Sequence, residues 1–415
     1  MRKILALSLI LLAVMLSINV AATETEETMK ISDIQPANAA EVLERTEPLV
    51  YTSPSGDTLN YRIYRSPAYT TDGDKAVLIV FLHGSGEKGT DNAAQLKGQS
   101  TYINFLVSSD AEEALKGVPY VIIAPQCPRG EIGPDNPVGY QWVNTPYSQV
   151  TYNLAETPIS KPLSLVEELI DSMVANENCD GDNIVLSGIS MGGFGAWDLA
   201  LRRPDIVKSL VPICGGGDPT YAKRIADKRI WVFHCEGDKS VPVDCSRDMV
   251  LALEAAGCDV KYTEFEIDGH NAWWPAATEV KDPTLIEWIF DGVDYKITKS
   301  DTAGGTVNIS AEAVKRGEPL TVIATPGDGY VLASLKINGE SVTPDESGSY
   351  TLEAVTAHSN VEAVFEIESA NEESAENGTA AAKDRKKSAL PWIIGAGAIL
   401  ASIAAFVAIN RKKKK

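Results

Sequence analysis

The chain has 415 residues, a formal net charge of −20 and 23% charged residues. A surface this acidic repels nucleic-acid phosphates, so a nucleic-acid-binding protein is excluded. The length exceeds that of one average domain and predicts a large core with accessory segments.

Residues 1–22 have the pattern of a secretory signal peptide. A basic start is followed by an apolar run at 4–16 and by small residues at 20–22, where cleavage is expected. The alternative is an uncleaved N-terminal anchor. Residues 23–45 are acidic and rich in alanine and threonine, and we expect a linker there.

Residues 46–294 alternate between strand-like and helix-like segments, which indicates an α/β domain with a mostly parallel sheet covered by helices. Strand-like patterns, several of them short apolar runs, predict strands at 59–64, 76–82, 118–124, 183–187, 207–214, 229–234 and 260–265. Helical periodicity predicts helices at 164–176, 193–201, 244–256 and 283–290.

The segment Gly-Ile-Ser-Met-Gly at 188–192 lies between a predicted strand and a predicted helix. A turn this tight holds its central residue in a strained conformation, and glycines flank it because a Cβ there would clash. A serine hydroxyl becomes nucleophilic when a histidine takes its proton and an acid orients that histidine. Ser190 is therefore the candidate nucleophile.

Four histidines are available as the base. His358 lies in a later region, His234 ends an apolar strand and reads as a core imidazole, and His83 precedes a glycine-rich loop that we expect it to hold. His270 lies in a turn just after the last predicted strand of the sheet, where a loop can reach the nucleophile. His270 is the candidate base.

Asp238, which follows the strand at 229–234, is the candidate acid, and Asp218 is the alternative. Ser190, Asp238 and His270 occur in the chain order of α/β-hydrolases. The expected fold of residues 46–294 is therefore an α/β-hydrolase, followed by a small all-β module.

Backbone N–H groups must stabilise the oxyanion that such a reaction forms. One donor is expected from Met191, which follows the nucleophile, and the other from the loop at 83–89, with Ser85 the candidate and Gly84 the alternative. This loop lacks the Gly-Lys-Ser/Thr pattern of a phosphate-binding loop.

The substrate-binding candidates are Gln126, Trp142 and Trp273. Gln126 follows a predicted strand, and Trp142 lies in a long insertion rich in proline and aromatic residues. Trp273 and its neighbour Trp274 follow His270 and could stack on a sugar or aryl ring. Packing in the core, in a lid or beneath the histidine loop is the alternative for all the tryptophans.

Residues 295–368 change in character to short β-type runs separated by turn residues. Strands are predicted at 304–309, 320–324, 330–337, 350–353 and 361–367. This all-β module resembles the small β repeats of bacterial surface proteins, for which a spacer role is favoured over ligand binding.

The composition of residues 369–389, rich in Glu, Asn, Ala and Lys, predicts a flexible stalk. Residues 390–409 carry no charge and are long enough to cross a bilayer as a helix, and the basic residues of 410–415 suit a cytoplasmic tail. The Leu-Pro-x-Thr-Gly element of a sortase substrate is absent, so retention in the membrane is favoured. The expected location is the extracellular face of the cell membrane.

Four stretches, at 81–92, 124–128, 188–198 and 211–218, resemble the exported esterases often labelled predicted peptidases, which are relatives of carbohydrate esterase family 1. The resemblance spans about residues 50 to 291. It implies the same triad and an ester substrate carried on a plant polysaccharide, as for feruloyl and acetyl xylan esterases. Cys235 departs from it, because relatives usually have glycine there.

The sequence thus predicts a secreted, membrane-anchored serine esterase that needs no metal or organic cofactor. The six cysteines and the histidines lack the spacing of a zinc site, and no disulfide pairing or oligomeric state follows from the sequence. A serine peptidase with the same triad and a non-enzymatic carbohydrate-binding surface protein are the alternatives.

Overall fold

The computed structural model describes residues 29–97, 101–130, 139–148, 152–281, 283–291, 294–300, 302–356 and 358–368. The predicted signal peptide, stalk, membrane helix and basic tail lie outside these residues. Within the described residues, no helix combines the length and the apolar character needed to span a membrane.

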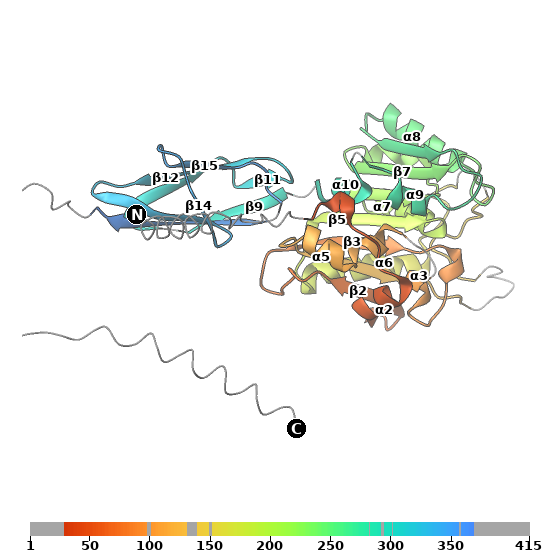
Figure 1. Cartoon of the computed structure of the whole chain (residues 1–415). Coiled ribbons are helices and arrows are strands. Elements are labelled where there is room, and N and C mark those ends of the chain that lie inside the picture. The colour runs from red at the N-terminus through yellow and green to blue at the C-terminus, as the bar shows by residue number, and fades with distance from the viewer. Residues whose placement is uncertain are drawn as a thin grey trace, which may run out of the picture. The chain divides into compact units, whose positions relative to one another are not determined.

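An eight-stranded sheet organises the first domain (Figure 1). Its strands are β1 (Glu47–Thr52), β2 (Thr58–Arg65), β3 (Ala76–Leu82), β4 (Tyr120–Pro125), β5 (Cys179–Ile189), β6 (Ser209–Ile213), β7 (Arg229–Cys235) and β8 (Lys261–Phe265). Their order is β1-β2-β4-β3-β5-β6-β7-β8. The strands from β4 to β8 in this order are parallel, and β2 is antiparallel to both of its neighbours. All seven strands that the sequence predicts are present, and β1 is additional.

Strand β3 shows why the sheet needs covering on both faces. Val77, Ile79 and Phe81 belong to one apolar core, whereas Leu78 and Val80 belong to the other. Successive side chains of a strand point to opposite faces, so a continuous apolar run is buried only when both faces are packed.

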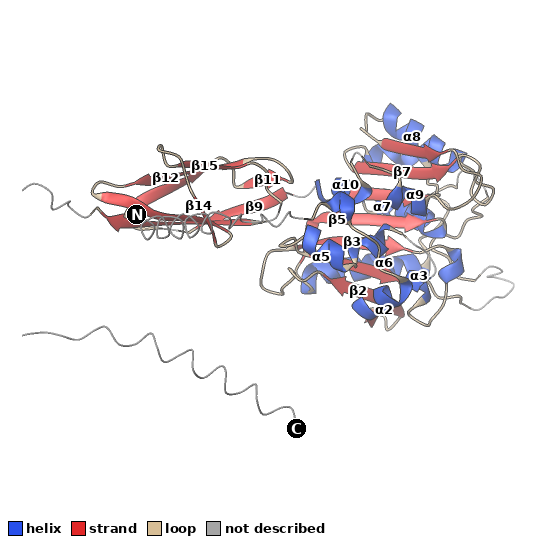
Figure 2. Cartoon of the chain, viewed as in Figure 1, coloured by secondary structure: helices blue, strands red, loops and turns tan. Residues whose placement is uncertain are grey.

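Helices pack on both faces of the sheet (Figure 2). One core contains side chains of α6 (Lys161–Asn176), α7 (Met191–Arg202) and α8 (Asp244–Ala255). The other contains side chains of α3 (Ala94–Lys97), α4 (Tyr102–Leu106), α5 (Ser109–Ala114), α9 (Trp273–Thr278) and α10 (Leu285–Asp291). Short 3-10 turns are η1 (Ile31–Asp33), η2 (Ser85–Glu87), η3 (Pro204–Ile206) and η4 (Pro219–Ile225). The predicted α/β fold class is confirmed.

The linker predicted at 23–45 is wrong for its described part. This part contains η1 and the helix α2 (Ala39–Arg45), and Ile34 and Val42 are buried at 4% and 1% exposure. The glutamates that give 23–45 the composition of a linker are concentrated at 24–27, whereas the described part carries an N-cap residue and good helix formers.

Polar contacts also fix α2 in place. The Asn38 side chain accepts hydrogen bonds from two backbone N–H groups of the first turn, which caps the helix. At the other end, the guanidinium of Arg62 on β2 donates to the carbonyl of Leu43 and to the hydroxyl of Thr46. The segment is therefore part of the folded domain.

The all-β module contains two sheets, with strand orders β10-β12-β15 and β11-β9-β16-β13-β14. The strands are β9 (Asp294–Lys299), β10 (Gly305–Ile309), β11 (Ala313–Lys315), β12 (Leu320–Pro326), β13 (Tyr330–Ile337), β14 (Glu340–Val342), β15 (Ser349–Leu352) and β16 (Ser359–Ile367). The five predicted strands are confirmed. Leu320, Val322, Val361 and Ala363 are buried at alternate positions of β12 and β16, as expected of strands with one face in a core.

Candidate active site

Ser190 occupies the tight turn between β5 and α7. Its backbone has φ 53° and ψ −118°, and a positive φ is one that non-glycine residues rarely adopt. A hydrogen bond of 2.8 Å from its N–H to the carbonyl of Ile213 on β6 holds the turn. The strand–turn–helix arrangement is the one that the sequence predicts.

The glycines on either side of Ser190 are required by close backbone approaches. A Cβ on Gly188 would lie 2.1 Å from the carbonyl oxygen of Gly192, and a Cβ on Gly192 would lie 1.9 Å from that of Leu82. Both distances are far below van der Waals contact. The turn can therefore form only because neither residue has a side chain.

The structure brings the three predicted triad residues together from distant parts of the chain. His270 Nε2 lies 2.7 Å from Ser190 Oγ, and His270 Nδ1 lies 2.5 Å from Asp238 Oδ2. Because an ionised carboxylate only accepts hydrogen bonds, Nδ1 carries the proton, and Nε2 is left to accept the hydroxyl proton of Ser190.

Asp238 is held in its ionised form. Burial alone would raise the pKa of this carboxyl group, but hydrogen bonds from His234, His270 and the backbone N–H of Val241 outweigh it and keep the pKa well below its usual range. The other oxygen, Oδ1, accepts from the N–H groups of Ser240 and Val241 at 2.8 and 3.0 Å. The carboxylate is thus fixed on both oxygens.

Asp218, the alternative acid, has a different position. Its Oδ1 accepts from the N–H and the hydroxyl of Thr220, and its Oδ2 accepts from the N–H of Leu154. These bonds cap η4 and tie down a neighbouring loop. The geometry favours Asp238 as the partner of His270.

The predicted oxyanion donors, Met191 and Ser85, are the first residues of α7 and η2. N–H groups at such positions have no acceptor inside their own helix, so they remain available to a ligand. The loop that carries Ser85 abuts the nucleophile, since a Cβ on Gly84 would lie 3.7 Å from Ser190 Cβ. The structure does not choose between Ser85 and Gly84 as the second donor.

His83 holds this loop, as its position in the sequence predicts. Nδ1 donates to the carbonyl of Gly84 at 2.6 Å, and Nε2 accepts from the N–H of Cys127 at 2.9 Å. Complete burial lowers the pKa of His83 to about 4, so the ring is neutral at neutral pH.

Two of the substrate-binding predictions are wrong. Gln126 is 1% exposed, and its amide donates to Glu87 and Asp91 in the loop after β3. Trp142 is fully buried and donates from its indole nitrogen to the carbonyl of His83. Both side chains hold the loop beside the nucleophile in place. Their polar groups are hydrogen-bonded to residues distant in sequence and so are not free to bind a substrate.

Trp273 lies beside the catalytic imidazole. Its ring meets that of His270 edge to face, with centroids 5.5 Å apart, and it is partly buried. The neighbouring Trp274 is 41% exposed and packs near Phe105. Trp273 therefore packs against the catalytic imidazole, and its contact with substrate stays a prediction.

Sequence reasoning missed the environment of the acid. His234 Nε2 lies 3.3 Å from Asp238 Oδ2, and the potential metal ligands Cys214, His234 and Asp238 are all within 4.8 Å of one another. All six cysteines are buried free thiols. The signal that could have revealed the contact is the four-residue spacing of a histidine and an aspartate at the end of β7.

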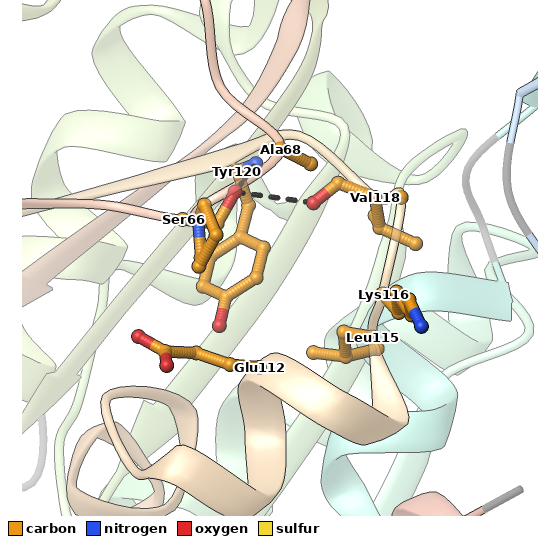
Figure 3. A pocket seen from close by; sticks show the side chains of 9 residues that line it. Ser66, Ala68, Glu112, Leu115, Lys116, Val118 and Tyr120 are labelled. Atoms are coloured by element: carbon orange, nitrogen blue, oxygen red, sulfur yellow. Dashed lines mark hydrogen bonds between the residues drawn. The ribbon is translucent and has the colours of Figure 1, made fainter. Parts of the chain in front are cut away.

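A pocket of about 210 Å³ lies elsewhere in the domain (Figure 3). Its wall includes Ser66, Glu112, Val118 and Tyr120, and the last of these begins β4. It therefore lies at the amino ends of the parallel strands, whereas Ser190, Asp238 and His270 follow the carboxyl ends. The pocket is separate from the triad.

Comparisons with known proteins give a family-model match within residues 295–369 and several solved structures that resemble part of the chain. Residues 295–369 match the Divergent InlB B-repeat domain, which agrees with the predicted repeat-like β module. No curated protein matches the chain.

Solved structures similar to the chain include a thermostable esterase and an acylaminoacyl peptidase of Pyrococcus horikoshii. The esterase is 31% identical, with 60% of this chain and 63% of that chain covered and a TM-score of 0.49. The peptidase is 18% identical, with 55% and 38% covered and a TM-score of 0.39. The chain thus spans less than two thirds of either protein.

The sheet order, the elbow at Ser190 and the chain order of Ser190, Asp238 and His270 together give the first domain an α/β-hydrolase fold that carries the site of a serine hydrolase.

Proposed function

We propose that the chain is a carboxylic ester hydrolase that works through an acyl-enzyme on Ser190. The observation that carries the proposal is the continuous hydrogen-bonded series from Ser190 Oγ through His270 to Asp238, on a nucleophile held in a strained turn. Asp238 is the acid that orients and stabilises His270.

In the first step, His270 Nε2 takes the hydroxyl proton as Ser190 Oγ attacks the ester carbonyl. The N–H groups of Met191 and of Ser85 or Gly84 stabilise the oxyanion. His270 then gives the proton to the departing alkoxide, which leaves an acyl group on Ser190. A water molecule, activated by the same imidazole, releases the acid and restores the serine.

Acetyl or feruloyl groups on plant polysaccharide are the proposed substrates, on the strength of the sequence resemblance to carbohydrate esterases. Trp273 is the proposed contact for a sugar or aryl ring. The signal-peptide pattern at 1–22 and the apolar segment at 390–409 support a location on the outer face of the cell membrane.

The test compares the full-length chain with Ser190→Ala on p-nitrophenyl acetate and methyl ferulate. We expect the variant to lose at least about a thousandfold in kcat. Ser172→Ala, on α6 away from the site, is the matched control and should keep full activity. Equal activity of Ser190→Ala and the native chain would contradict the assignment of Ser190 as the nucleophile.

Substrate class is tested with acetylated and feruloylated xylans beside peptide amides. Release of acetate or ferulate supports the proposal. Hydrolysis of amides without hydrolysis of esters would identify a peptidase instead.

A further inference from the structure

The carboxylate of Asp238 is contacted by two imidazoles. Its Oδ2 lies 2.5 Å from His270 Nδ1 and 3.3 Å from His234 Nε2. His270 is partly exposed, as a base that meets substrate must be, whereas His234 is completely buried. The proposed mechanism uses only the first of these rings.

The hydrogen-bond partners of His234 show where its proton lies. Nε2 faces the carbonyl oxygen of Val241 at 3.1 Å as well as Asp238 Oδ2. Both are pure acceptors, so Nε2 must carry a proton and donate it. The ring thus donates this N–H to the carbonyl of Val241, and the same N–H lies within reach of the acid of the triad.

The opposite side of the ring is fixed by a serine. Nδ1 lies 2.7 Å from the hydroxyl of Ser246 on α8, and this hydroxyl lies 3.1 Å from the carbonyl of Gly215, so its single proton goes to Nδ1 when the ring is neutral and to Gly215 when Nδ1 is protonated. A hydroxyl both donates and accepts, so Ser246 can satisfy Nδ1 in either protonation state of the ring. The orientation of His234 is therefore set from both ends.

We propose that His234 is a positioning residue for the triad, acting through Asp238. This inference rests on the proposed serine hydrolase function. The N–H at Nε2 holds negative charge on Oδ2 and fixes that oxygen toward His270, because a hydrogen bond to an ionised acceptor is strong and directional. A buried carboxylate deprived of this donor is costly and turns toward another partner.

The consequence for catalysis has a definite sign. Removing the donor leaves more charge on Oδ2, so the carboxylate holds the proton on His270 more tightly. His270 must be neutral to act as a base, and the acid limb of the kcat/KM profile then moves to higher pH. The other ionisable groups around His234 are the thiols of Cys214 and Cys235 and the carboxylate of Glu264, its neighbour across the strand pair on β8.

The experiment replaces His234 by leucine, which removes the donor, and by glutamine, whose amide can donate in its place. In the full-length chain, we expect His234→Leu to lose roughly tenfold to a hundredfold in kcat with KM nearly unchanged and with the acid limb at higher pH. His234→Gln should recover part of both effects.

A structural control separates positioning from packing. Phe233→Leu changes the adjacent, fully buried residue of β7, and it should lower the unfolding midpoint while leaving the acid limb in place. Loss of activity in His234→Leu without a shift of the limb, or native kcat and pH profile in the folded variant, would overturn the proposal.

The proton on Nε2 is read directly by ¹⁵N NMR of histidine-labelled protein, with His234→Gln used for assignment. A protonated Nε2 supports the donor, and an unprotonated Nε2 overturns it even if His234→Leu fails to fold. The spectrum does not depend on turnover. An inactive native chain would contradict the proposed function, and an unprotonated Nε2 would still exclude a hydrogen bond from His234 to Asp238.

Discussion

At the residue scale, the two candidate acids differ in what their carboxylates bind. Asp238 accepts from His270, whereas Asp218 accepts from backbone and hydroxyl groups of its own and a neighbouring loop. We expect Asp238→Asn to lower kcat by about 10⁴-fold, because the amide favours the wrong tautomer of His270. Asp218→Asn should act mainly on stability. Steady-state kinetics of both variants decides, and a larger kcat loss in Asp218→Asn would reverse the assignment.

The neutral, buried ring of His83 makes stability depend on pH. Its pKa of about 4 lies below the ordinary value of 6.5, so between these values the unfolded chain binds a proton that the folded chain does not. The contribution of His83 to the free energy of unfolding is therefore complete above pH 6.5. It is lost as the pH falls toward 4, by up to about 3 kcal/mol. Urea unfolding of the native chain and of His83→Gln at pH 7 and pH 4.5 measures it. An equal loss of stability in both proteins would contradict the prediction.

At the element scale, the central strands were predictable because β3 to β7 each contain a short apolar run, and β3 matches its predicted bounds. The elbow was predictable because only glycine fits at 188 and 192. The segment before residue 46 was not, since its burial depends on contacts with the sheet and with Arg62 rather than on its own pattern.

The same limit applies within the site. Ser190, Asp238 and His270 each follow a strand of a parallel sheet, and the carboxyl ends of such strands meet at one edge. Gln126 occupies an equivalent position, yet its amide is used inside the protein, by the backbone N–H of Asn92 and by Glu87. Which polar groups at that edge remain for substrate is decided by loop packing, which the sequence does not display.

The folded state of α2 gives a prediction of its own. Val42→Asp places a carboxylate at a position that is 1% exposed and should cost at least about 3 kcal/mol of unfolding free energy. Val50→Asp, on β1 at 58% exposure, is the matched control and should change it by less than about 0.5 kcal/mol. Chemical denaturation of the two variants measures the difference. If both variants match the native chain, α2 is not part of the cooperative unit.

At the scale of the whole molecule, the chain joins an α/β-hydrolase domain to a repeat-type β module, and the proposed anchor lies beyond both. Twenty uncharged, mainly apolar residues at 390–409 match the thickness of a bilayer. Deleting 390–415 should move the protein from the membrane fraction to the soluble fraction without changing kcat. Fractionation followed by an esterase assay tests this. A truncated protein that still sediments with membranes would place the anchor elsewhere.

The backbone of Ser190 carries a further consequence. Alanine in its place removes the hydroxyl but keeps the unfavourable φ of 53°, whereas glycine removes both the hydroxyl and the strain. Glycine normally makes a folded chain less stable than alanine does. Here we expect the free energy of unfolding of Ser190→Gly, measured with denaturant, to exceed that of Ser190→Ala by about 1 kcal/mol. The opposite order would show that the turn is unstrained. If the expected order holds, glycine is the substitution favoured at position 190 in a relative that no longer needs activity. That single substitution would remove catalysis and raise stability together.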